Sequence, residues 1–302
     1  MDPVLLVVSI MVSATPILLA AIGELVAEKA GVLNLGVEGM MITGAVMGFA
    51  IAVTTGSPTL GFLGAAVASA VLSLSFGILT QYLLSNQVAT GLGLTLVGLG
   101  LSALIGSNYE GQRAPSLPKL DIPLLGDIPV AGRMLFSHDF VVYLSLVLVV
   151  AVWAFLKFTR AGLILRAVGE DHESAHALGY KVVRVRMAAI AFGGACAGLG
   201  GAYVSLVRVP QWTEGMTAGA GWIALAIVVF ASWRPLGVLI GAYLFGGVTV
   251  IQLNLQAAGT TVPVELLSMS PYLITIIVLV IISARGSHGA PGSLGRPFHA
   301  AS

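Results

Sequence analysis

The sequence is poor in charged residues. Asp, Glu, Lys and Arg make up 9% of its 302 residues and apolar residues 57%, whereas soluble domains carry roughly 25% charged residues. Such a chain lacks the polar surface needed to cover itself in water, and its mean hydropathy of +1.00 agrees with this. The composition therefore indicates an integral membrane protein.

The sequence also lacks the residue patterns of common catalytic and cofactor sites. A single cysteine, Cys196, excludes an internal disulfide. No phosphate-binding loop of the form G-x-x-x-x-G-K-[ST] occurs, so the chain is not expected to hydrolyse ATP itself. His172 and His176 stand four residues apart without a third metal ligand, which is typical of a solvated helix face. We therefore expect no catalytic residue, metal or cofactor in this chain.

What the sequence has instead is a series of long apolar runs. A helix needs about 20 largely apolar residues to cross a membrane. Nine runs qualify: 4–22, 40–56, 59–84, 87–106, 140–157, 187–207, 219–233, 236–256 and 266–284. They predict an all-α, polytopic membrane helix bundle that forms a single transmembrane domain over residues 1–284. The Gly/Ser/Pro-rich remainder, 285–302, is expected to be a disordered tail.

The two longest polar connections differ in charge. The loop 158–186 is rich in arginine and lysine, whereas the loop 107–139 has three basic residues balanced by four acidic ones. By the positive-inside rule, the loop 158–186 and the C-terminal tail are expected on the cytoplasmic side and the loop 107–139 outside.

The segment GELVAEKAGVLNLGVEG, residues 23–39, places polar side chains among glycines between the first two apolar runs. If it crosses the membrane, the chain has ten crossings and a cytoplasmic N-terminus; if it does not, nine crossings place the N-terminus outside. Such a composition suits a broken helix, which is tolerated at membrane depth where it lines a cavity or is buried in protein. We predict a short interrupted crossing here, with Asn34 and Glu38 facing a pathway and the N-terminus cytoplasmic. Glu24 and Glu28 are expected at the membrane interface.

The run FGGACAGLGGAY, residues 192–203, has small residues at four-residue spacing. In a membrane this spacing lets helix backbones approach closely. We expect this span to be packed tightly inside the bundle.

The basic loop contains a short predicted helix. Glu170 or Asp171 is placed to cap it, Glu173 lies in its first turn, and Gly179 is placed to end it. The pattern alone fits two roles: an ordinary interfacial connector, or an element that docks in a groove of a cytoplasmic partner.

The run RAVGEDHESAHALGYKVVRVRMAAIAFGGACAGLGGAY, from Arg166 to Tyr203, resembles the cytoplasmic coupling loop of bacterial ABC importer permeases of the ribose, nucleoside and branched-chain amino acid family. EKAGVLNLGVEGMMITGA, residues 28–45, is similar to the segment after the first span of the nucleoside-type members. The resemblance extends from about residue 10 to residue 284. The positions that match the coupling motif are Ala167, Val168, Gly169, Glu170, Ala175, Ala177 and Gly179, and Asp171 replaces the more usual Asn.

The resemblance implies a transmembrane subunit of an importer in the bacterial cytoplasmic membrane. It implies a second permease subunit, an external substrate-binding protein or lipoprotein, and a cytoplasmic subunit that binds ATP and docks at the coupling helix. The residues expected at that docking site are Glu170, Asp171, Glu173, Ala175, Ala177 and Gly179. The expected cargo is a small molecule, with a nucleoside as the first assignment and a simple sugar or branched-chain amino acid as the alternative; no nucleic-acid partner is expected.

Polar residues inside membrane spans are costly and are therefore candidates for the substrate pathway. The candidates are Asn34, Glu38, Asn86, Thr90 and Thr95. Asn and Thr side chains can hydrogen-bond a base or a ribose, but they can equally satisfy neighbouring helices or broken backbone. An ion-coupled secondary transporter and a membrane-embedded enzyme are the rival classes, and both are disfavoured by the scarcity of charged or clustered catalytic residues within the spans.

Overall fold

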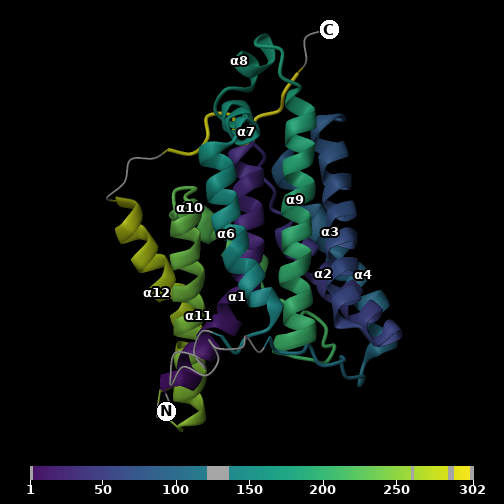
Figure 1. Cartoon of the computed structure of the whole chain (residues 1–302), viewed down its shortest axis with the longest axis vertical. Helices are drawn as coiled ribbons and strands as arrows, with labels where there is room; N and C mark the ends of the chain where they lie inside the picture. Colours follow the sequence, from purple (N-terminus) through teal and green to yellow (C-terminus); the bar gives the residue numbers. More distant parts are fainter. Residues whose placement is uncertain (1–2, 121–135, 260–261, 285–288, 300–302) are drawn as a thin grey trace.

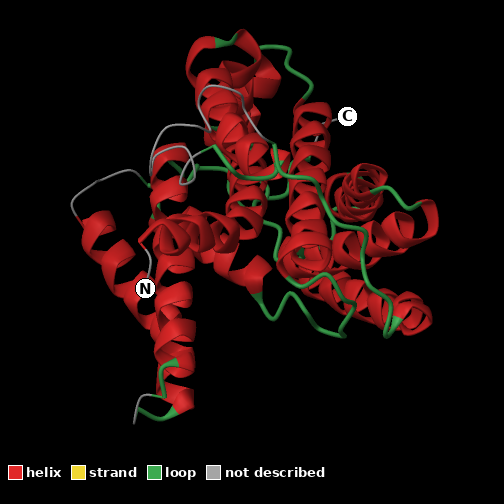
Figure 2. Ribbon diagram, turned by 60° about the horizontal axis from the view of Figure 1, so that its bottom comes forward, coloured by secondary structure: helices red, strands yellow, loops and turns green. Residues whose placement is uncertain are grey.

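A computed structural model of the chain describes residues 3–120, 136–259, 262–284 and 289–299. Helices make up nearly all the regular structure of these residues (Figure 2). The α-helices are α1 (Pro3–Lys29), α2 (Val37–Thr55), α3 (Pro58–Gln81), α4 (Gln87–Gly106), α6 (Phe140–Phe158), α7 (Arg160–Glu170), α8 (His172–Ala177), α9 (Val182–Tyr203), α10 (Ala220–Phe230), α11 (Pro235–Ala257) and α12 (Val264–Ala284). A 3₁₀ turn, η1 (Ser107–Tyr109), follows α4, and a π-helical turn, η2 (Val204–Arg208), extends α9.

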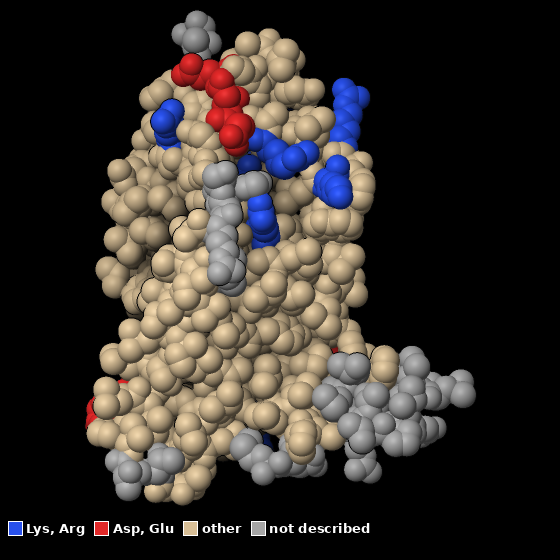
Figure 3. Space-filling model, turned by 90° about the vertical axis from the view of Figure 1, so that its left-hand side faces the viewer, with Lys and Arg blue, Asp and Glu red and all other residues tan. Residues whose placement is uncertain are grey.

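The prediction of an all-α, polytopic membrane bundle is confirmed. Among the residues described, seven helices are long and apolar enough to cross a membrane, and two shorter apolar helices accompany them. In the face shown in Figure 3, lysine, arginine and acidic side chains gather at one end, and the middle of the molecule is free of them. Charge at the end and an uncharged belt beside it suit a bilayer, in which charged side chains are costly.

Helix α9 lies in the core and packs against α1, α2 and α3. Its small residues permit this: a Cβ added at Gly198 would lie 2.5 Å from the carbonyl oxygen of Ala65 on α3. A Cβ at Gly201 would overlap the carbonyl of Met41 on α2. The predicted close packing of this span is therefore confirmed.

The first part of the segment 23–39 does not form a crossing of its own. Helix α1 continues through it to Lys29, the chain is irregular from residue 30 to residue 36, and α2 then begins. The prediction of an interruption is confirmed, but the predicted tenth crossing is wrong. Helix α1 begins at the end of the bundle opposite α7 and α8 (Figure 1), so the prediction that the N-terminus shares a side with the loop 158–186 is also wrong.

The predicted span 219–233 is shorter than expected. Helix α10 has 11 residues, which at 1.5 Å per residue covers about half of a 30 Å hydrocarbon core. The chain that leads into it, residues 209–219, is not α-helical. The bundle therefore contains a second interrupted segment in addition to residues 30–36.

The predicted disordered tail is wrong for residues 289–299, which pack against the end of the bundle that carries α7 and α8 (Figure 1). Ser293 and Phe298 are 3% and 6% exposed. Residues 285–288 and 300–302 lie outside the described part of the chain.

The described residues of the loop 107–139, which are 107–120 and 136–139, lie at the opposite end (Figure 1). They make two isolated β-bridges, Arg113 with Gln211 and Lys119 with Asp139. The Asp139 side chain caps α6 and also accepts a hydrogen bond from the Tyr203 hydroxyl at 2.8 Å. The loop is thereby fastened to α9; residues 121–135 lie outside the described part.

Candidate functional site

The short helix predicted in the basic loop is formed by α8, and Asp171 is its cap. One carboxylate oxygen of Asp171 accepts hydrogen bonds from the backbone N–H groups of Glu173 and Ser174, each at 3.1 Å, and the other accepts the Ser174 hydroxyl at 2.5 Å. These hydrogen bonds lower the pKa of the Asp171 carboxyl, because they stabilise its charged form. Gly179 ends the turn after α8 with a φ of +87°, a conformation that favours glycine.

The residues expected at the docking site lie on and around this helix. Glu170, Asp171, Glu173, Ala177 and Gly179 are exposed, whereas Ala175 is buried against the bundle. Beside them Leu178 is 76% exposed, an apolar side chain at the tip of the molecule. The exposed surface of α8 thus combines acidic groups with one large apolar group, and it is free in this chain.

Beneath this surface lies Arg186, which is fully buried near the start of α9. Its guanidinium reaches four different segments. The acceptors are the carbonyl oxygens of Ala30 at 3.2 Å and Arg296 at 3.1 Å, the Gln81 amide oxygen at 3.3 Å, and His172 Nδ1 at 3.1 Å. Composition gave no sign of this role, because Arg186 is one of several arginines in the basic loop and any of them suits the positive-inside rule.

The interrupted segment 30–36 brings two of the predicted pathway residues together. The Asn34 side chain accepts a hydrogen bond from the Gly36 backbone at 2.9 Å, and the Thr95 hydroxyl donates to the Leu35 carbonyl at 3.2 Å. Gln87, which was not predicted, accepts the Leu33 N–H at 2.8 Å. Asn34 and Thr95 therefore satisfy backbone groups that the broken helix leaves without helical partners.

Glu38 joins the two interrupted segments. Its carboxylate accepts hydrogen bonds from the Thr217 hydroxyl at 2.6 Å and from the backbone N–H groups of Gly219 at 3.0 Å and Gly221 at 2.7 Å. Glu38 lies in the first turn of α2, and these donors lie at the start of α10. Both helices direct the positive ends of their dipoles at this carboxylate, which accounts for a 4% exposed acid without a basic partner among its hydrogen bonds.

Asn86 and Thr90 lie apart from this group. Asn86 is exposed and caps α4 by accepting the Ala89 N–H at 3.0 Å. Thr90 is bonded to the hydroxyl of Ser85 at 2.8 Å. The structure thus gives Asn86 and Thr90 a local role at the start of α4 and does not bring them to Glu38.

Two further acids of the segment 23–39 are inside the bundle, where an interfacial position was expected. Glu24 is 2% exposed and Glu28 is fully buried. Glu28 accepts a hydrogen bond from the Trp233 indole, and the Glu24 carboxyl faces the backbone N–H of Asn34. Both acids are buried because α1 extends past the apolar run, so that its last two turns remain surrounded by other helices.

A cavity of about 290 Å³ lies next to Glu38 and shares Thr217 with it. It lies among α1, η2, α10, α11, α12 and the segment 209–219, and its polar lining residues are Arg208, Thr217, Thr249, Gln252, Ser268 and Tyr272. Its hydroxyl groups, its amide group and the aromatic ring beside them suit a hydroxylated solute.

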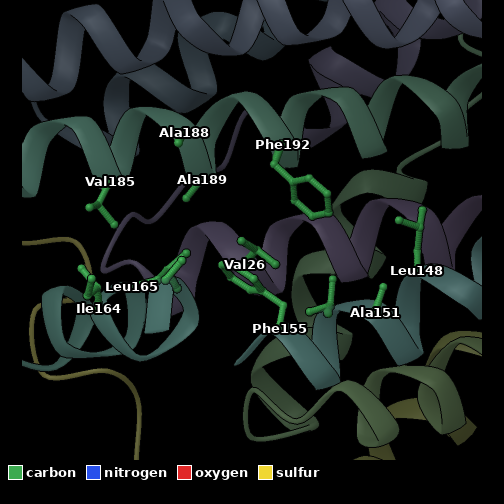
Figure 4. Close-up of a pocket in the computed structure, with 12 residues that line it drawn as sticks. Val26, Leu148, Ala151, Phe155, Ile164, Leu165, Val185, Ala188, Ala189 and Phe192 are labelled. Carbon is green, nitrogen blue, oxygen red and sulfur yellow. The ribbon is translucent and has the colours of Figure 1, made fainter. Parts of the chain in front are cut away.

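A second cavity, of about 480 Å³, has a different character. Figure 4 shows that its side chains come from α1, α6, α7 and α9, and all of its lining residues are apolar. Val26, Phe155 and Phe192 are among them (Figure 4). No polar group is present to orient a hydroxylated solute, so this cavity does not fit a substrate site.

Comparison with known proteins identifies the family. The family described as "branched-chain amino acid transport system / permease component" matches residues 6–282. The chain belongs to this permease family. No solved structure matches it.

Three curated relatives of this permease span most of its length. A provisionally named glucose ABC transporter permease protein of Haloferax volcanii is 40% identical, over 88% of each chain. A guanosine ABC transporter permease protein of Bacillus subtilis is 31% identical over 97% of this chain and 96% of its own. A nucleoside ABC transporter permease protein of Lactococcus lactis is 30% identical over 92% of both chains.

Family membership makes the permease a transport component of an ABC importer. The family implies an ATPase partner and a substrate-binding protein, as the resemblance indicated. The relatives' names include both glucose and nucleosides. The class of protein predicted from the sequence is therefore confirmed.

Proposed function

We propose that this permease carries a neutral solute containing a sugar ring, with a nucleoside as the first assignment, and that ATP hydrolysis in a separate subunit drives it. The observation that carries the proposal is the meeting of two interrupted segments, 30–36 and 209–219, around Glu38 beside a polar cavity. In transporters, helices broken in this way commonly form the substrate site near the middle of the membrane.

The end of the bundle with α7 and α8 is, in this proposal, the cytoplasmic end. Arg160, Arg166, Lys181 and Arg184 lie on or beside α7, α8 and the start of α9, as the positive-inside rule expects. The ATP-binding subunit would dock on the exposed face of α8, with Leu178 entering an apolar groove of that subunit and the acids Glu170, Asp171 and Glu173 meeting basic groups around it. The N-terminus would then lie on the outer side of the membrane, and nine helices among the described residues would cross it fully or in part.

Within the pathway, the proposed role of Glu38, Asn34 and Thr95 is to fix the broken segments, and the cavity beside Glu38 supplies the groups that face the solute. Ser268, Gln252 and Thr249 can exchange hydrogen bonds with sugar hydroxyls, and Tyr272 offers a ring against which a base or a sugar face can pack. Asn86 and Thr90 remain proposed as pathway residues, but they would contribute only where the pathway passes the start of α4.

The relatives named for guanosine and nucleosides favour a nucleoside, and the relative named for glucose favours a simple sugar. Both solutes present ring hydroxyls, so the experiment must separate them. Uptake of labelled guanosine is measured in cells that express the permease with its partner subunits, in the presence of excess unlabelled glucose or adenosine. We expect adenosine, and not glucose, to compete with the labelled guanosine. Competition by glucose alone would indicate a simple sugar as the substrate and would leave the class of importer unchanged.

A matched pair of variants tests the cavity itself. We expect Gln252→Leu to reduce uptake of the labelled solute, because the cavity loses its side-chain amide group. Asn254→Leu, two positions along the same helix and outside the cavity lining, is the control. Equal uptake by both variants would remove this cavity from the pathway.

A further inference from the structure

The C-terminal segment 289–299, named here the C-terminal strap, joins two parts of the bundle that are far apart in sequence. Its Ser293 N–H donates to the Gly169 carbonyl at 2.8 Å, and its Gly295 N–H donates to the Gly31 carbonyl at 3.2 Å. Gly169 lies near the end of α7, and Gly31 lies in the interrupted segment after α1. The strap is therefore hydrogen-bonded to both the α7–α8 turn and the α1–α2 connection.

Side chains add to these backbone contacts. The Ser293 hydroxyl accepts the N–H of His172, the first residue of α8, at 3.1 Å. Phe298 packs with Val168, Ala175 and Val182, which belong to α7, α8 and α9. Phe298 also meets the His172 ring edge-on, with 5.4 Å between the ring centroids. Burial of the Phe298 ring near the end of the strap holds the strap on α8.

Arg186 is hydrogen-bonded to the same two parts of the bundle and to the strap. It donates to the Ala30 carbonyl just past the end of α1, to the Arg296 carbonyl of the strap, and to His172 at the start of α8. Its fourth acceptor, Gln81, is the last residue of α3. The carbonyl ends of α1 and α3 carry the negative ends of their helix dipoles, which stabilises a buried guanidinium whose four acceptors named above are all neutral.

From these contacts we infer that the C-terminal strap and Arg186 form a tie that transmits displacement of α8 to the segment 30–36. This inference rests on the proposed function, because it assumes that an ATP-binding subunit moves α8. Helix α8 has six residues, and so short a helix transmits force only where other elements hold it. The tie leads from α8 to residues 30–36, and that segment continues directly into the first turn of α2, where Glu38 holds the start of α10. The role of Arg186 and the strap is one of positioning, and neither is required to touch the solute.

The experiment measures whether the segment 30–36 senses the ATPase. A cysteine is placed at Leu33, which is partly exposed, in a Cys196→Ala background. The permease is purified in complex with its ATP-binding subunit, and the rate of maleimide labelling is compared without nucleotide and after trapping with ATP and vanadate. The variants are Phe298→Ala and removal of residues 292–302; Phe298→Leu keeps an apolar side chain, and His299→Ala, at an exposed neighbouring position, is the control.

We expect the labelling rate to change by about fivefold or more on trapping, the lower range of typical couplings between sites. The change should persist in His299→Ala and Phe298→Leu and be lost in Phe298→Ala and in the truncated chain, while all variants still copurify with the ATP-binding subunit. A truncated chain that keeps the full change in labelling rate would overturn the tie. A parent complex whose labelling rate does not change on trapping would also overturn it. Failure of the parent chain to bind any ATP-binding subunit would instead contradict the proposed function.

Arg186→Lys separates positioning from stability. Lysine keeps the charge but has three donors on one nitrogen, and it cannot reach all four acceptors in the fixed geometry of a guanidinium. We expect Arg186→Lys to fold and to bind the ATP-binding subunit, with a labelling response reduced toward that of the truncated chain. An unchanged response in Arg186→Lys would remove Arg186 from the tie and leave the strap alone to carry it.

Discussion

Glu38 caps a helix to which it does not belong: its carboxylate accepts the N–H of Gly221, in the first turn of α10, at 2.7 Å. A Cβ added at Gly221 would lie 2.5 Å from the Glu38 backbone nitrogen, so this approach requires glycine. The two starts of α2 and α10 are therefore held together by one acid and one glycine, separated by 183 positions in the sequence.

Removal of the Glu38 carboxylate should destabilise this junction. Each hydrogen bond to a charged group contributes about 1.5–3 kcal/mol, and three N–H or O–H donors would lose their acceptor. We expect Glu38→Ala to lower the thermal midpoint in detergent clearly, and Glu38→Gln, which keeps one acceptor oxygen, to lower it less. Glu265→Ala is the matched control, since Glu265 also lies in the first turn of a helix but is exposed. Equal midpoints for Glu38→Ala and the control would refute this role.

Close packing of α9 against α2 gives a second prediction. An alanine at Gly201 would clash with the Met41 carbonyl, and its Cβ would lie 2.9 Å from the Ala45 nitrogen. Overpacking of this kind costs about 1–3 kcal/mol or more, because backbone rather than a flexible side chain must move. We expect Gly201→Ala to reduce the yield of monodisperse protein, whereas Gly100→Ala, which meets nothing within 4 Å, should leave it unchanged.

The contact between His172 and Arg186 predicts a dependence on pH. His172 Nδ1 must be unprotonated to accept from the guanidinium. Burial, and then the charge of Arg186, lower the pKa of His172 below its ordinary value of 6.5; Arg296 acts in the same direction, and Asp171 and Glu173 oppose it. The folded protein therefore disfavours protonation relative to the unfolded chain, so the free energy of unfolding should fall as the pH drops below about 6.5.

Denaturation at pH 8 and at pH 5.5 measures this loss. His172→Gln retains an amide oxygen that can accept from Arg186 but does not titrate, so it should reduce the difference in stability between the two pH values. A parent protein and a His172→Gln variant with the same pH dependence would show that His172 does not contribute to it.

The cap of α8 predicts how two substitutions at Asp171 differ. Asparagine caps a helix about as well as aspartate, whereas lysine cannot accept the N–H groups of Glu173 and Ser174, a loss of about 1 kcal/mol. We expect Asp171→Asn to preserve coupling and Asp171→Lys to leave ATP hydrolysis running with uptake reduced at least severalfold. The ratio of solute transported to ATP hydrolysed is the measurement, and an unchanged ratio in Asp171→Lys would contradict the proposed role of α8 as the coupling helix.

The helices and the Asp171 cap were accessible from the sequence because both depend on local information: runs of about 20 apolar residues and a cap directly before a helix. The failures depend on contacts between distant parts of the chain. A Gly/Ser/Pro-rich composition predicts disorder, yet Phe298 finds a buried site between α7, α8 and α9. Glu28 was expected at the membrane interface from the sequence. In the structure, the Trp233 indole, which belongs to the turn after α10, donates a hydrogen bond to its buried carboxylate.

The same difference between local information and contacts from distant parts of the chain applies to the candidate site. Intramembrane polarity drew attention to Asn34, Glu38 and Thr95, because burying such groups is costly unless they find partners. Of the partners of Glu38, Gly221 lies within the apolar run 219–233, which predicted an uninterrupted span, and Thr217 lies just before that run. Asn86 carried the same signal of polarity but serves as a helix cap, a role that its position directly before α4 indicates equally well.

In the proposed function, this permease moves its solute only when a separate ATP-binding subunit hydrolyses ATP. Uptake of labelled guanosine, and in parallel of labelled glucose, is measured in liposomes that contain the permease with its partner subunits and in liposomes that contain this chain alone. We expect uptake of one of these solutes that requires ATP, the ATP-binding subunit and the external binding protein, and no gradient-driven flux by the chain alone. Flux through the chain alone under a proton or sodium gradient, with no response to ATP in the complete complex, would contradict it.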